Sequence, residues 1–114
     1  MAHNKITYLE LPATDVAGLT KFYGELFGWT FQDYGPEYSA FTQAGLDGGI
    51  NAEAASRTKA PLPVIETTEI EAVEAKIRAA GGKITAPIFA YPGGRRFHFV
   101  DPAGNELAVM QSGE

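Results

Sequence analysis

The residues best suited to chemistry lie in a short segment near the C-terminal end of the sequence. The run from Arg96 to Val100 alternates in the manner of a β-strand, and alternate side chains of a strand share one face. Arg96 and His98 therefore place a fixed cation beside an imidazole. Because the unperturbed pKa of histidine lies near neutrality, His98 could act as a general base or anchor a ligand. The simpler interpretation, which we favour, is a strand histidine hydrogen-bonded to a neighbour.

A tight turn and a second strand follow this segment. Asp101-Pro102-Ala103-Gly104 has aspartate first, proline second and glycine fourth, which are the preferences of a type I turn. Residues 106–111 alternate again and predict the returning strand of a hairpin. On that strand Glu106, Ala108 and Met110 share one face.

The composition is typical of one folded globular domain, with 45% hydrophobic and 20% charged residues in a chain of 114. The net charge is -5 and the one adjacent basic pair is Arg95-Arg96, so we expect no nucleic-acid partner. The absence of cysteine excludes disulfides and thiolate chemistry. The sequence has neither a signal-peptide pattern nor an apolar run long enough for a bilayer. We therefore expect a cytoplasmic protein with no membrane partner.

The first half of the chain is predicted to form a strand, a helix and three strands. Residues 6–11 alternate as a strand, and Asp15 and Gly28 then provide start and stop signals for a helix. The apolar stripe of this helix consists of Val16, Leu19, Phe22, Tyr23, Leu26 and Phe27. The three strands are predicted at Trp29–Gln32, Tyr38–Thr42 and, weakly, Gly49–Asn51.

The second half repeats this order. Residues 62–66 are predicted to be a strand, and Thr68 and Glu71 form a capping-box pattern at the start of a helix. The helix carries a favourable (i, i+4) pair, Glu74 and Arg78. Its apolar stripe, which ends before Gly81-Gly82, consists of Ile70, Val73, Ile77 and Ala80. The strands that follow are predicted at Lys83–Phe89, Arg96–Val100 and Glu106–Gln111.

Each half is therefore a βαβββ module, which predicts an α+β fold. We expect one domain over residues 1–114, with module one at 5–51, a linker at 52–60 and module two at 61–112. A single helix covers one face of such a half-sheet and leaves the other open. The two modules are therefore expected to pair into a cupped mixed sheet. The N-terminal His3 is expected to fray.

These motifs resemble those of the vicinal oxygen chelate superfamily, which includes glyoxalase I, bleomycin-resistance proteins, fosfomycin-modifying enzymes and extradiol dioxygenases. The resemblance covers essentially the whole chain. It rests on Leu9–Asp15, Phe22-Tyr23, Leu26–Trp29 and Asp101–Asn105. It implies the glyoxalase/bleomycin-resistance fold and a homodimer, in some relatives with modules exchanged between chains.

In metal-dependent members of that superfamily, His, Glu or Gln side chains from the first and last strands of each module hold one divalent ion. By count from the motifs, these positions fall on Tyr8, on Leu62 or Val64, on Ala108 and within 47–51. Leucine, valine and alanine have no lone pair, neutral tyrosine is a poor ligand, and a catalytic metal usually has three protein ligands. We therefore predict no metal site and no cofactor.

The resemblance and the strand alternation together predict which side chains line the cup. The predicted ligand-binding residues are Tyr8, Glu10, Tyr38, Arg96, His98 and Met110, while Phe97 and Phe99 face the helix. Glu10 and Arg96 could bind a polar ligand or pair with each other. The two tyrosines could stack on a flat ligand or fill the cavity.

These features predict a metal-free protein that binds an amphipathic small molecule. One alternative is a metal-dependent lyase, isomerase or dioxygenase with displaced ligands such as His98, Glu10 or Asp47. The other is a structural or interaction module whose cup is filled by side chains. The sequence leaves open whether the protein is an enzyme, and it identifies neither catalytic residues nor the ligand.

Overall fold

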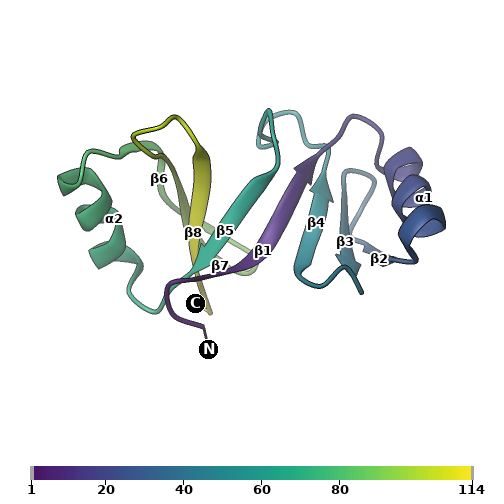
Figure 1. The fold of residues 1–114 in the computed structure, drawn as a ribbon, viewed down its shortest axis with the longest axis horizontal. Coiled ribbons are helices and arrows are strands. Elements are labelled where there is room, and N and C mark those ends of the chain that lie inside the picture. The colour runs from purple at the N-terminus through teal and green to yellow at the C-terminus, as the bar shows by residue number, and fades with distance from the viewer. Residues whose placement is uncertain (1, 114) are drawn as a thin grey trace. The chain divides into compact units, whose positions relative to one another are not determined.

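The computed structural model describes residues 2–113 and has eight strands and two helices within that range (Figure 1). The order of these elements along the chain is β1 (Lys5–Pro12), α1 (Val16–Phe27), β2 (Thr30–Asp33), β3 (Tyr38–Thr42), β4 (Asp47–Asn51), β5 (Leu62–Glu66), α2 (Ile70–Ala79), β6 (Lys83–Tyr91), β7 (Gly94–Val100) and β8 (Glu106–Ser112). This order is βαβββ twice, so the predicted α+β class is confirmed. No helix among the described residues is long and apolar enough to cross a membrane.

The chain divides into two compact units. The first unit is Tyr8–Leu62, and the second unit joins the described residues before Tyr8 to those from Pro63 onward. His3, which we expected to fray, is held in the second unit. Its Nδ1 lies 2.7 Å from the hydroxyl of Thr68, so that expectation is wrong.

The first unit is a four-stranded mixed sheet with α1 on one face (Figure 1). The strand order is β2-β3-β4-β1, with β1 and β4 parallel and the remaining pairs antiparallel. The Asp15 carboxylate accepts a hydrogen bond from the N–H of Gly18 at the start of α1. Gly28 ends the helix in the left-handed conformation, with φ of 76°. Both helix-boundary predictions are confirmed, because each depends on local backbone chemistry.

The core of the first unit lies between α1 and the sheet. Val16, Phe41 and Ile50 are its buried members, and Leu19 and Trp29 pack against them. Three members of the predicted helix stripe, Phe22, Leu26 and Phe27, are instead exposed. The spacing located the helix correctly, but the sheet covers only part of its apolar surface.

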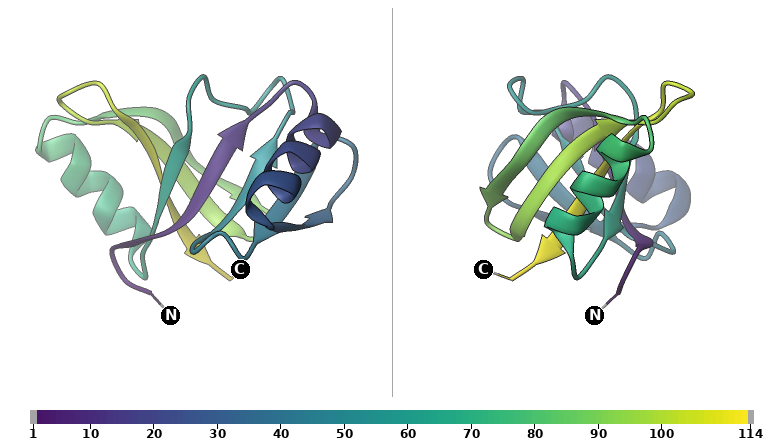
Figure 2. Two further views of the ribbon diagram at one scale, coloured as in Figure 1. Left: turned by 45° about the vertical axis from the view of Figure 1, so that its right-hand side comes forward. Right: turned by 90° about the vertical axis from the view of Figure 1, so that its left-hand side faces the viewer.

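The second unit repeats the design. The strand order is β5-β8-β7-β6, with β5 and β8 parallel and the remaining pairs antiparallel, and α2 lies against β6, β7 and β8 (Figure 2). Ile70, Phe97, Phe99 and Val109 form the buried cluster between helix and sheet. The predicted orientation of Phe97 and Phe99 toward the helix is therefore confirmed.

The start of α2 differs from the predicted capping box. The N-cap residue is Glu69, and its side chain caps no N–H group. The hydroxyl of Thr68 bonds to His3, and Glu71 pairs with Arg95. The N–H of Ile70 instead donates to the side-chain oxygen of Gln111, 41 residues away, at 3.0 Å. The capping-box prediction is wrong because long-range partners replace the local ones.

This long-range cap gives a stability prediction. Gln111→Ala removes the acceptor for the first N–H of α2, so we expect the free energy of unfolding to fall by about 1 kcal/mol. Urea denaturation measures the loss. The matched control is Gln32→Ala, since Gln32 is exposed and its side-chain amide donates to the carbonyl of the adjacent Asp33. Equal losses in the two variants would contradict the capping role.

The turn that joins β7 to β8 has the predicted form. The N–H of Gly104 donates to the carbonyl of Asp101 at 3.0 Å, as a type I turn requires. The Asp101 carboxylate accepts from the backbone N–H groups of Ala103 and Asn105 and from the Asn105 amide. These hydrogen bonds, with those from Asn105 first, lower the pKa of Asp101. The predicted pair between Glu74 and Arg78 on α2 is also present, at 3.1 Å.

Candidate ligand-binding site

In the second unit, the sheet face opposite α2 carries the predicted polar residues. The register pairs Arg96 with Met110 and His98 with Ala108 on the neighbouring strands β7 and β8. Val64 lies next to Ala108 across the parallel pairing of β5 with β8. Arg96, His98 and Met110 therefore lie together on this face, as the family resemblance and strand alternation together predicted.

An arginine–histidine–glutamate chain lies on this face, and its members are Arg96, His98 and Glu106. The Nε and Nη2 atoms of Arg96 lie 3.2 and 2.9 Å from Nε2 of His98. The Nδ1 atom of His98 lies 3.4 Å from a carboxylate oxygen of Glu106. Arginine can only donate, so Nε2 is the acceptor and the ring proton is on Nδ1, toward Glu106. The predicted hydrogen-bonded strand histidine is present, and its Nε2 lone pair is directed at Arg96 rather than at a substrate.

Two aromatic residues of β6 complete this surface. The guanidinium of Arg96 lies over the ring of Tyr91, 5.6 Å from its centroid. The ring of Phe89 is 6.1 Å from that of His98. We did not predict either residue as part of the site. Their spacing of two along β6 puts them on one face of the strand, and this is the signal that could have identified them.

In the first unit, a second polar cluster lies on the sheet face opposite α1 and is formed by residues of β1 and β3. The hydroxyls of Tyr8 and Tyr38 are 2.5 Å apart, and the hydroxyl of Tyr38 donates to Glu10 at 3.2 Å. Since the single proton of Tyr38 points to Glu10, Tyr8 is the donor between the two tyrosines. The structure therefore brings together the three residues predicted from this half of the chain.

A glycine permits this arrangement. Gly49 lies on β4, opposite Glu10 on β1 and Ala40 on β3. A side chain at this position would overlap the ring and hydroxyl of Tyr38. Gly49 thus has a steric function, because it lets the Tyr38 ring lie across β4.

The environment of Tyr38 keeps its hydroxyl neutral. Burial, and then the nearby carboxylate of Glu10, raise its pKa above the ordinary value of 10.0. The unfolded chain releases this proton near its ordinary pKa. The contribution of Tyr38 to the free energy of unfolding is therefore fully present below about pH 10 and declines as the pH rises further.

The alkaline decline is a testable consequence. We expect the free energy of unfolding to fall above pH 10 by up to about 1.4 kcal/mol per pH unit from this one group. Tyr38→Phe should remove that decline and cost about 1–2 kcal/mol at neutral pH, since Glu10 loses a donor. Denaturation curves at a series of pH values measure both effects. Parallel pH dependences for the two proteins would contradict the assignment.

The positions that hold a metal in metal-dependent relatives do not offer a ligand set in this chain. Val64 and Ala108 are buried carbon side chains, and Leu62 is also buried. The hydroxyl of Tyr8 bonds to Tyr38, and Asp47 lies opposite Tyr8 in the register. Within residues 2–113, no group of three or more His, Cys, Asp or Glu side chains is placed to hold an ion. The residues present do not fit a metal centre with three protein ligands.

A separate surface hollow of about 400 Å³ lies in the first unit, between the end of β1 and the segment before β5. It is lined by Pro12, Ala13, Thr14, Ala54, Arg57, Thr58 and Lys59. None of the predicted ligand-binding residues is among them, so this hollow is distinct from both sheet faces.

Comparison with known proteins identifies the family. Residues 5–109 match the model of the Glyoxalase/Bleomycin resistance protein/Dioxygenase superfamily, so the chain belongs to this superfamily. The resemblance inferred from the motifs is confirmed.

A curated relative is CFP32 of Mycobacterium bovis, whose name assigns it provisionally to the glyoxylases. It is 28% identical over 92% of this chain, and the match covers 44% of its own length. The chain thus spans less than half the length of the curated relative.

Solved structures with low sequence identity share the fold. A superfamily member from Vibrio splendidus has a TM-score of 0.72 at 16% identity, covering 96% of this chain and 99% of its own. The methylmalonyl-CoA epimerase of Streptomyces coelicolor has a TM-score of 0.71 at 14% identity, covering 99% and 100%. At such identities the likeness establishes the fold alone.

Proposed function

We propose that this protein binds an amphipathic small molecule without a metal ion, and that Arg96 provides the principal polar contact. The observation that carries the proposal is the arginine–histidine–glutamate chain on the sheet face of the second unit opposite α2. His98 fixes the position of the guanidinium, which carries a permanent positive charge and suits an anionic group such as a carboxylate.

The surroundings of this cation favour a ligand that also has an apolar part. Tyr91 lies under the guanidinium, and Phe89 lies beside His98. Met110 is the partner of Arg96 across β7 and β8, and its flexible thioether adapts to varied apolar shapes. A planar carboxylate with an aromatic body matches both properties. Tyr8, Glu10 and Tyr38 are proposed contacts on the face of the first unit.

A catalytic role receives less support from the same geometry. The Nε2 atom of His98 accepts from Arg96, so the imidazole would have to lose that contact before it could remove a proton from a substrate. The apolar side chains at the metal positions supply no ligands for a metal ion that could act as a Lewis acid. Binding is therefore the function that these residues support best. The proposal includes a cytoplasmic location, with which the cysteine-free sequence is compatible.

A ligand-stabilisation screen tests the proposal. Matched pairs of aromatic carboxylates and their neutral carboxamides are added to chelator-treated protein, and the melting temperature is measured. We expect carboxylates to raise it and their carboxamide partners to raise it less. A rise that requires added divalent metal would favour the metal-dependent alternative and contradict the proposal. No rise with any pair would favour a face filled by the protein's own side chains.

A further inference from the structure

The surface hollow beside the end of β1 is lined by two positive charges that the proposed ligand-binding face does not use. Arg57 and Lys59 both line it, together with Thr14 and Thr58. Neither cation forms an ion pair with a carboxylate of the described residues 2–113. The chain as a whole has a net charge of -5, so acidic side chains were available to neutralise them. Two cations left beside one concave surface attract an anion from solution.

The guanidinium of Arg57 is held in position by backbone carbonyls. Its Nη1 atom donates to the carbonyl of Ala13 at 3.3 Å and to that of Ala52 at 3.1 Å. These two residues follow the ends of the parallel strands β1 and β4. Nη1 carries two N–H groups, and the two carbonyls use both of them. The edge formed by Nε and Nη2 keeps two parallel N–H groups, which match two oxygens of a phosphate or carboxylate.

The segment that carries these cations is also anchored. The N–H of Glu53 donates to the side-chain oxygen of Asn51 at 2.9 Å, and the N–H of Arg57 donates to the carbonyl of Glu53 at 2.9 Å. The carboxylate of Glu53 accepts from the hydroxyl of Ser56 at 2.6 Å, rather than pairing with Arg57. A loop that is ordered before binding loses less conformational entropy when a ligand binds.

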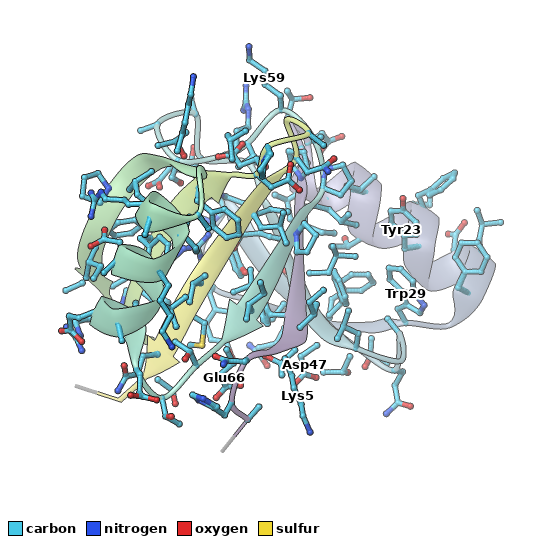
Figure 3. The ribbon with its side chains drawn as sticks, turned by 60° about the vertical axis from the view of Figure 1, so that its left-hand side comes forward. Lys5, Tyr23, Trp29, Asp47, Lys59 and Glu66 are labelled. Carbon is cyan, nitrogen blue, oxygen red and sulfur yellow. The ribbon has the colours of Figure 1, made fainter. Side chains whose placement is uncertain are left out.

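We propose that this hollow is a second binding site, separate from the sheet face opposite α2, and that it takes a small phosphate monoester. Such a group carries nearly two negative charges at neutral pH, which two cations balance better than they would a single carboxylate. Arg57 supplies the paired N–H groups. Lys59, whose exposed side chain extends from the loop, supplies a mobile point charge (Figure 3). The volume of about 400 Å³ and the short side chains of Pro12, Ala13 and Ala54 suit a compact molecule.

Titration of the isotopically labelled chain with glycerol phosphate, followed by NMR at constant ionic strength, tests the site. We expect saturable shifts of the backbone amides at 13–14 and 52–59, with a dissociation constant of about 0.1–1 mM from two charge-assisted contacts. Arg57→Met should raise this constant by at least about 10-fold, and Lys59→Gln by about 3–10-fold. Equal shifts with neutral glycerol, no saturation below about 20 mM, or wild-type binding in both variants would overturn the proposal.

Lys59→Gln keeps the test valid if Arg57→Met disturbs the loop. Lys59 makes no hydrogen bond or ion pair within residues 2–113, so its replacement changes the charge of the hollow and leaves the loop contacts in place. Circular dichroism checks that each variant is folded.

Two further arginine variants are matched controls. Arg78→Met removes an equal charge from α2, where Arg78 pairs with Glu74, and should leave the constant unchanged. Arg96→Met should also bind glycerol phosphate as the wild type does, whatever happens to its binding of aromatic carboxylates. A loss in Arg78→Met as large as that in Arg57→Met would show a general charge effect and rule out a specific site. A loss confined to Arg96→Met would place the phosphate on the sheet face opposite α2 and refute the second site.

Discussion

Replacing Arg96 with methionine is expected to weaken the binding of an aromatic carboxylate by about 10–100-fold. The change removes the charge but keeps an unbranched side chain of similar length beside Tyr91 and Met110. Hydrogen bonds to charged groups contribute about 1.5–3 kcal/mol, which corresponds to this range. Isothermal titration with a compound from the screen measures the loss. The neutral carboxamide partner of that compound should lose much less affinity.

The neighbouring arginine provides a matched control for this change. Arg95 lies next to Arg96 on β7, but it pairs with Glu71 of α2. Arg95→Met therefore removes an equal charge from the other side of the same strand, and we expect no change in affinity. If both variants lost binding equally, the effect would come from the overall charge of the protein, and the role assigned to Arg96 would be wrong.

Replacing Gly94 with alanine is expected to lower the free energy of unfolding by about 2–4 kcal/mol. Gly94 is buried and opens β7 with φ of 146°, a conformation that side chains rarely adopt. An added Cβ atom would overlap the backbone of β8, at the carbonyl oxygen of Gln111. Backbone cannot move away without breaking the pairing of β7 with β8. Urea denaturation measures the loss.

A second glycine separates the two causes of that loss. Gly45 also has a positive φ, of 92°, but an added Cβ atom there would meet no atom within 4 Å. Gly45→Ala should therefore cost only the backbone strain, about 1 kcal/mol. A loss in Gly94→Ala no larger than that in Gly45→Ala would show that β8 does not restrict this position.

Local sequence signals located the elements of this fold well. Asp15 and Gly28 predicted both ends of α1, and the Asp101–Gly104 turn has its expected hydrogen bond. These features depend on a few consecutive residues, whose side chains bond to their own backbone. Strand alternation, together with the family resemblance, predicted that Phe97 and Phe99 face the helix. Such patterns can be recognised in a sequence because the interactions join residues that lie at fixed, short separations along the chain.

Long-range partners could not be predicted in the same way. Thr68 and Glu71 match a capping box, yet they bond to His3 and Arg95, while Gln111 caps α2. The local pattern offers one set of partners, and the folded chain uses others. Sequence spacing contains no information on which of these competing hydrogen bonds is made.

In the candidate site, too, some features were predictable from the sequence and others depend on tertiary packing. The sequence, through strand alternation and the family resemblance that it carries, predicted that Arg96, His98 and Met110 share a face and that the metal positions of the family hold Val64 and Ala108, which lack the lone pairs a metal requires. Only the tertiary structure decided that His98 is a neutral acceptor for Arg96, because its tautomer depends on both neighbours at once. It also decided that much of the apolar stripe of α1 stays exposed. Helical spacing shows that apolar residues share a side, but how much of that side is buried depends on the width of the sheet beneath it.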